Sequence, residues 1–281
     1  MAISQKPLDR AEYVEQAYLF QLLRERIAAE LPMQELLEQI RFELMTTTKL
    51  PIAVDYLLTE LKHSGQMHPA MLKLGHYFTP FQSFLIAQAE QESGRFTMET
   101  ALQVLEAEAK YREEGCTQAG LFFFQFEVLC RNRLHYDRGL TAISNDPLFS
   151  KPWSKWILML RAQIGLVDMA DLLFLASEEY EARLKEAGES VEGKGPFLFG
   201  RKEGRIALGN RQKEPLYLFG AMQRHLGYPV VPRPKPREEN KDAIPQLMRR
   251  MERLESRVKL MEEERRASLD ITKFYKKPGD E

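Results

Sequence analysis

The chain has 281 residues, of which 44% are hydrophobic and 29% charged, and its formal net charge is −1. This composition is ordinary for a soluble, helix-rich protein with one large domain or two smaller ones. Residues 1–16 lack the apolar core of a secretory signal, and no apolar run approaches the roughly 20 residues that span a bilayer. The two cysteines, Cys116 and Cys130, lack the paired spacing of a metal site and fit free thiols. We therefore expect a cytoplasmic protein without a membrane span.

The first 112 residues are predicted to form closely spaced helices joined by brief turns. Apolar residues recur there at intervals of three and four. Pro32 and Pro80 suit the first turn of a helix, and Gly94 suits the position after a helix end. Such a pattern is typical of an antiparallel bundle. The expected helices cover Asp9–Glu30, a stretch from Pro32, Pro51–His63, His68–Tyr77, a stretch from Pro80 to Ser93, and a stretch from Thr97.

Two short motifs in this half resemble a known family. Ala29–Met33 has a leucine–proline helix start, and Glu90–Phe96 ends a segment that begins with a proline. Over about residues 18–112 the chain resembles the cytoplasmic helical domain of the inner-membrane F proteins of type II secretion and type IV pilus systems. The chain differs from that family in having Glu30 and Glu90 in place of glycines, Gln91 in place of a glutamate, and no transmembrane helices. The resemblance implies a partner in a secretion or pilus-type assembly.

The bundle is expected to continue to residue 188, with eight to nine helices over residues 8–188. Gln118–Leu134 is the most apolar candidate and should lie centrally. Phe122–Phe126 alone could also form a short strand, but the polar residues Gln125 and Glu127 do not alternate cleanly with the apolar ones, which favours a helix. Two further helices are predicted over Trp153–Ile164 and Asp168–Glu186.

Residues 189–227 are predicted to form a small, glycine-rich, basic appendage. The short apolar runs Pro196–Phe199 and Arg205–Leu208 lie between glycines, as in a small hairpin. A helix should follow from Pro215 to Gly227. Residues 228–242 contain several prolines, which predicts an extended linker. The expected fold class is therefore mainly α, with a mixed α/β appendage.

Residues 243–268 show the heptad pattern of a coiled coil, and residues 269–281 are expected to be a disordered tail. Charges flanking the heptad fit a parallel homo-oligomer, because Arg250 would face Glu255 of a second copy. The residues predicted to form the oligomerisation core are Ile244, Leu247, Met251, Leu254, Val258 and Met261.

The residue pairs that resemble metal sites are isolated. Glu60 and His63 share one helical face, as in di-iron bundles, but such sites need a second pair and two more glutamates. Asp168 and Asp171 could hold magnesium, although a helix cap and a solvated side chain explain them more simply. The sequence therefore predicts no metal site.

Nucleophilic and phosphate-binding patterns are incomplete as well. Cys130 and His135 could form a thiol–imidazole pair, but no third group or oxyanion feature can be placed, and a buried structural thiol explains Cys130 better. Gly193–Pro196 lacks the spacing of a P-loop, and its proline removes a backbone donor. We therefore expect no catalytic residues and no cofactor.

The basic segment 193–237 is the strongest candidate binding region outside the bundle. It holds ten Lys and Arg residues against two acids, interleaved with aromatic residues. It could bind nucleic acid, dock on an acidic protein, or form a solvated or self-packed face. The candidate residues for an anionic partner are Arg201, Lys202, Arg205, Arg211, Lys213 and Arg224.

Taken together, these features predict a non-enzymatic scaffold or adaptor. It would self-associate through residues 243–268 and dock a protein partner. One alternative is a nucleic-acid-binding protein that uses residues 193–237. The other is an enzyme whose site is assembled from residues far apart in the sequence.

Overall fold

A computed structural model describes residues 6–27, 32–91, 96–233 and 251. The chain divides into two units, residues 1–234 and 235–281, and each is treated by itself. Within the described residues the first unit is helical, which confirms the predicted class, and no helix there is long and apolar enough to cross a membrane. Its helices are α1 (Arg10–Ile27), α2 (Met33–Ile40), α3 (Leu50–Ser64), α4 (His68–Lys73), α5 (Pro80–Ala89), α6 (Met98–Glu113), α7 (Gln118–Arg131), α8 (Tyr136–Ser144), α9 (Lys151–Gln163), α10 (Met169–Leu175), α11 (Glu178–Glu186), α12 (Arg201–Gly209) and α13 (Pro215–Leu226).

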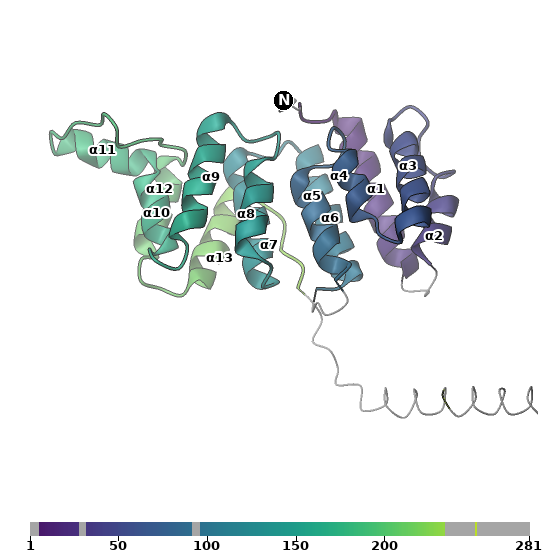
Figure 1. Ribbon diagram of the computed structural model, residues 1–281. Helices are drawn as coiled ribbons and strands as arrows, with labels where there is room; N and C mark the ends of the chain where they lie inside the picture. Colours follow the sequence, from purple (N-terminus) through teal and green to yellow (C-terminus); the bar gives the residue numbers. More distant parts are fainter. Residues whose placement is uncertain (1–5, 28–31, 92–95, 234–250, 252–281) are drawn as a thin grey trace, which may run out of the picture. The chain divides into compact units, whose positions relative to one another are not determined.

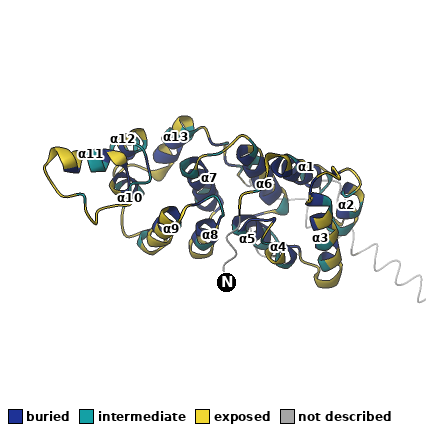
Figure 2. Cartoon of the chain, turned by 90° about the horizontal axis from the view of Figure 1, so that it is seen from above, coloured by how far each residue is buried: buried dark blue, intermediate teal, exposed yellow. Residues whose placement is uncertain are grey.

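The helices of the first unit pack in two rows. One row contains α2, α1, α6, α7, α13 and α12, and the other contains α3, α4, α5, α8 and α9, as seen from above in Figure 2. Contacts between α2 and α3, α5 and α6, and α7 and α8 join the rows. Figure 1 shows these helices coloured along the sequence. Buried residues gather between the rows, while the outer helical faces are exposed (Figure 2). The bundle is therefore a layered stack of helices.

Helix α7 lies at the centre of the core, and Phe122–Phe126 is helical, so the strand alternative is wrong. The Phe122 ring lies 5.1 Å from the Trp156 ring and 6.3 Å from the Phe199 ring. Polar Gln125 also faces inward, where Glu108 and Asp146 bind it. A helix with apolar residues on nearly every side needs partners all round, and α7 has α8 and α13 among its neighbours.

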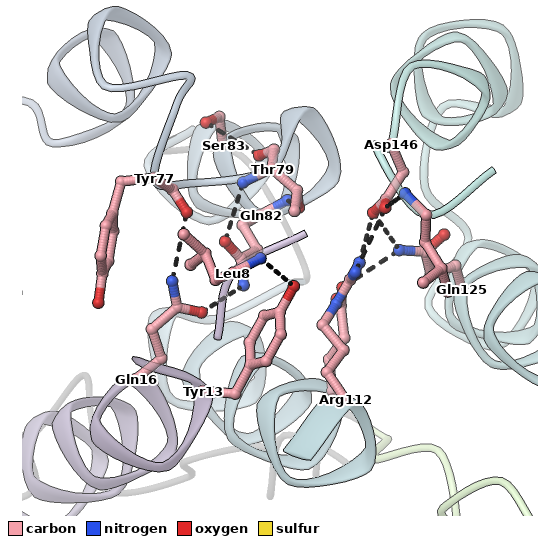
Figure 3. Close-up of polar contacts among 12 residues, drawn as sticks. Leu8, Tyr13, Gln16, Tyr77, Thr79, Gln82, Ser83, Arg112, Gln125 and Asp146 are labelled. Carbon is pink, nitrogen blue, oxygen red and sulfur yellow. Dashed lines mark hydrogen bonds and ion pairs between the residues drawn. The ribbon is translucent and has the colours of Figure 1, made fainter. Parts of the chain in front are cut away.

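Local capping explains where several helices begin. Thr79 and Gln82 form a capping box at the start of α5, in which each side chain binds the other residue's backbone N–H, at 3.2 Å and 3.0 Å (Figure 3). Pro80 occupies the first turn of α5, and Thr97 caps α6, as predicted. These interactions satisfy backbone donors that have no partner within the helix.

The predicted hairpin is wrong. Arg205–Leu208 belongs to α12, because Gly204 and Ala207 form a helical face that packs inward. A Cβ atom at Gly204 would lie 2.3 Å from the Ser177 hydroxyl, so this glycine permits close packing of α12. Phe199 makes only an isolated bridge with Ser177. In the described part of the appendage, the structure is helical, with no mixed α/β element.

Residues 8–188 contain eleven helices among the described residues, more than the eight to nine predicted. The predicted helix Asp168–Glu186 is broken, because the Ser177 hydroxyl accepts a hydrogen bond from the Tyr180 N–H and starts a new helix, α11. Helix α8 was not predicted. Its Leu140 and Ile143 are buried, and its Gly139 packs closely against Leu129, where a Cβ atom would lie 2.6 Å from the leucine side chain.

The predicted linker 228–242 is packed at its first residues. Tyr228 and Val231 are buried, and the Asn132 side-chain amide donates to the Pro232 carbonyl at 3.3 Å. Residues 234–242 and 269–281 lie outside the described residues. So do five of the six predicted oligomerisation residues, Ile244, Leu247, Leu254, Val258 and Met261. The sixth, Met251, is helical and exposed, and the coiled coil stays a prediction.

Candidate functional site

A buried ionic cluster joins α6 to the turn between α8 and α9. The Arg112 guanidinium contacts Glu108, with its Nε 2.8 Å from Glu108 Oε1, and it also contacts Asp146. The Gln125 amide nitrogen lies 3.2 Å from Glu108 Oε1 and 3.4 Å from Asp146 Oδ2. Figure 3 shows Arg112, Gln125 and Asp146 converging from three elements. All four side chains are buried, so a substrate could not reach them without local opening.

The cluster carries an excess of negative charge when both carboxyl groups are ionised. Burial raises the pKa of Glu108, although the Arg112 guanidinium works in the opposite direction. Glu108 Oε2 has no hydrogen-bond partner within the described structure. Buried, paired and closed to solvent, the cluster fits a structural role better than a catalytic one.

The isolated pairs considered for metal binding have other partners. Glu60 forms an ion pair with Lys73 at 2.6 Å, while His63 is exposed. Asp168 caps α10 by accepting from the Ala170 N–H at 3.0 Å, which confirms the cap, and it accepts from the Gln212 N–H at 2.8 Å. Asp171 pairs with Arg211. Across the residues that the structure describes, no three His, Cys, Asp or Glu side chains are grouped for a metal ion.

The six basic candidate residues differ in whether they have partners within the described structure. All are exposed, but Arg205 forms an ion pair with Glu179 at 3.0 Å, and Arg211 pairs with Asp171. Lys213 donates to the Gly209 carbonyl at 2.6 Å. The three others have no ion-pair partner in the described structure: Arg201, Lys202 and Arg224. An anionic partner for this segment stays a prediction.

An apolar groove lies between the end of α7, the start of α8, the α9–α10 turn and the start of α13. Its volume is about 430 Å³, which is within the range of protein ligand sites. Phe126 and Phe219 are buried in its wall, with rings 5.8 Å apart. The lining residues are Phe126, Cys130, Arg131, Tyr136, Ile164, Gly165, Met169, Glu214, Pro215, Leu216, Leu218 and Phe219.

Large apolar side chains remain exposed beside this groove. Leu166 follows the lining residue Gly165 and is 83% exposed. Leu216 lines the groove and is 46% exposed, and its neighbour Tyr217 is 63% exposed. Clustered apolar surface of this kind marks a site where another molecule binds. We call Leu166, Val167, Leu216 and Tyr217 the apolar rim.

A few polar groups lie among the apolar walls. Arg131 donates through Nε to Glu127, which holds its guanidinium in place, and the Tyr228 hydroxyl donates to the same carboxylate at 2.7 Å. Neither terminal nitrogen of Arg131 has a hydrogen-bond partner among the described residues. Burial raises the pKa of the Cys130 thiol to about 11, so this thiol is neutral near pH 7. The groove therefore offers an available guanidinium and no activated nucleophile at Cys130.

Sequence reasoning did not find this groove. Cys130 was placed correctly on an apolar helix face, but its nearness to Leu216 depends on how α13 packs against α7. The one local signal was an apolar pair, Leu216 and Tyr217, in the first turn of a helix, where polar residues are common. His135 occupies the N-cap position of α8 without a side-chain cap hydrogen bond, and the described structure contains no hydrogen bond between His135 and Cys130.

Comparison with family models, curated proteins and solved structures found no match to this chain. The resemblance to secretion F proteins therefore stays a prediction.

Proposed function

We propose that this chain is a non-enzymatic adaptor that holds a protein partner at the groove between α7 and α13. The observation that carries this proposal is the apolar rim, because Leu166 and Leu216 expose apolar surface that is unfavourable in water. The rim extends beyond the cavity, so its full coverage requires a macromolecule. The heptad of residues 243–268 would bring several adaptor copies together, and the motif resemblance favours a partner from a secretion or pilus-type assembly.

A photo-crosslinking amino acid at Leu166, in the full-length chain expressed in its native cells, tests the docking role. We expect one specific crosslinked protein, lost when Leu216 is changed to Asp. A second crosslinker at Leu72, which is 59% exposed on α4, is the matched control and should not give that product. Equal crosslinking from both positions, or a product insensitive to Leu216→Asp, would contradict the proposal.

Self-association is tested separately by light scattering. The full-length chain should form an oligomer, and the double variant Leu254→Asp, Val258→Asp should give monomers, because charged residues at core positions destabilise a coiled coil. An unchanged mass would remove the assigned role of residues 243–268. The crosslinking result would still stand in that case.

A further inference from the structure

We propose that the partner segment at the groove is an amphipathic helix whose apolar face is bordered by an acidic side chain that binds Arg131. This inference rests on the proposed docking function and names the chemistry of the partner. It follows from three properties of the groove: an apolar rim that extends beyond the cavity, a lack of strand edges among the described residues, and an oriented guanidinium.

The size of the apolar surface favours a protein segment over a small molecule. A ligand confined to the 430 Å³ cavity would leave Leu166 and Tyr217 uncovered, because neither of them lines it. Both residues flank lining residues, Gly165 and Leu216, on two different elements. A rod-shaped protein segment that lies across the cavity could place one side chain inside the cavity and other side chains over the apolar rim. Apolar anchors at helical spacing are suited to this arrangement.

The backbone chemistry favours a helix over an extended peptide. An extended peptide in an apolar groove leaves N–H and C=O groups without partners unless it pairs with a strand edge. The described residues contain no β-strand, and Pro215 in the wall has no backbone N–H to offer. A helix satisfies its own backbone groups and presents only side chains to the groove. The occupant is therefore expected to be helical.

The charged residues at the groove determine which charged side chains the partner helix should carry along the two edges of its apolar face. Arg131 uses Nε to bind Glu127, so its two terminal nitrogens remain available at the groove wall. A carboxylate is the side chain that matches this donor geometry best. On the α13 side, Glu214 is exposed and would repel a second acid there, so a basic or neutral residue fits that border. The preferred partner helix therefore carries an acid on one border only.

Fluorescence anisotropy with two designed peptides tests this chemistry on the full-length chain. Each peptide has about 18 residues, about 27 Å as a helix, with leucines at helical spacing. The first peptide has glutamates on one border of the leucine stripe and lysines on the other, and the second has lysines on both borders. We expect the first to bind about tenfold more tightly, since one charge-assisted pair distinguishes them.

Three variants assign the binding to the groove. Leu216→Asp should abolish binding of both peptides, and Arg131→Met should remove the tenfold preference while leaving apolar binding. Leu72→Asp is the control and should change neither. Circular dichroism checks that each variant folds. If Arg131→Met does not fold, the preference is measured on the unaltered chain, where it should shrink as salt rises from about 50 mM to about 500 mM.

The remaining outcomes each overturn one statement. Equal binding of the two peptides would overturn the acidic border. If neither peptide binds although the Leu166 crosslink still forms, the helical occupant is wrong and the docking function stands. Saturable binding of decanoate with displacement of the peptide would show that the groove is a site for small amphiphiles, and the helical occupant would then be wrong. Loss of the crosslink itself would overturn the proposed function.

Discussion

The Arg112 guanidinium of α6 binds the Asp146 carboxylate in the turn between α8 and α9, and both side chains are almost completely buried. The same guanidinium contacts Glu108 one helical turn away. These contacts connect the helices before residue 114 with those after it. The ionic cluster is therefore expected to matter for the stability of the whole first unit.

Replacing Arg112 with Met should destabilise the chain by about 3–5 kcal/mol, because two buried carboxyl groups lose their common partner. Urea denaturation followed by circular dichroism would measure the free energy of unfolding. Arg10→Met is the control: Arg10 forms an exposed ion pair with Glu113 at 3.1 Å, and such pairs contribute about 0–1 kcal/mol. Equal effects of the two substitutions would show that the buried cluster has no special role.

Glu108→Gln, unlike Arg112→Met, should not lower the free energy of unfolding. The amide removes the excess negative charge of the cluster while keeping an oxygen that can accept from Arg112. The variant should be as stable as the unaltered chain near pH 7, or more stable. Strong destabilisation by Glu108→Gln would mean that Glu108 is ionised and required as an anion.

The pH dependence of stability should also depend on Glu108. Burial raises the pKa of this carboxyl group in the folded chain, so the folded chain holds the proton more tightly than the unfolded chain. The contribution of Glu108 to the stability of the folded chain is complete below the ordinary carboxyl pKa of about 4.3. This contribution is lost as pH rises through the raised pKa that Glu108 has in the folded chain. Arg112 and Asp146 face it and stay in place in Glu108→Gln, so the difference between the two chains isolates this group.

The free energy of unfolding would be measured for both chains at several pH values between about 4 and 8. The advantage of Glu108→Gln should grow as pH rises above the ordinary carboxyl pKa of about 4.3. A constant difference across that range would contradict the raised pKa.

Helical periodicity predicted most of the first unit, because local spacing and capping determine where helices form. Thr97 and Pro80 begin helices as expected, since a cap or a ring-constrained first turn acts within a few residues. In the sequence, the polar side chain of Gln125 argues against a strand. The reason that it is tolerated in the core is its contact with Glu108, which no local pattern reveals.

The errors arose where packing between distant elements decides the structure. The helix that contains Arg205–Leu208 packs closely at Gly204, where a Cβ atom would lie 2.3 Å from the Ser177 hydroxyl. Tyr228 follows a glycine and precedes a proline, as a linker residue would, but its hydroxyl reaches Glu127 in α7. The groove depends on the same packing of α13, so neither its lining nor its rim could be found from spacing.

Tyr228→Phe should destabilise the chain by about 1–3 kcal/mol. The substitution removes the hydroxyl that donates to Glu127, whose carboxylate is buried and would lose one of its two partners. The ring itself, stacked on Phe123 with centroids 6.3 Å apart, would remain. Thermal and urea unfolding would measure the loss. Val230→Ala is the matched control, because Val230 is 78% exposed in the same segment and should change stability little.

Both thiols should react slowly with iodoacetamide in the folded chain. Burial raises the pKa of Cys116 and of Cys130, each to about 11, so at pH 8 only about 0.1% of either is thiolate, against about a quarter of an ordinary cysteine. The folded chain should therefore be alkylated at least about a hundredfold more slowly than the urea-unfolded chain. Cys116→Ser and Cys130→Ser assign each rate by mass spectrometry.

Cys130 also reports on the groove, because it lines the cavity and Cys116 does not. Binding of the glutamate-bordered peptide should slow the alkylation of Cys130 further, since the helix would cover the thiol, and leave that of Cys116 unchanged. Equal protection of both thiols would indicate a general gain in stability and no local coverage. Rapid alkylation of Cys130 in the free chain would show that the thiol is ionised, and the groove would then contain a reactive nucleophile.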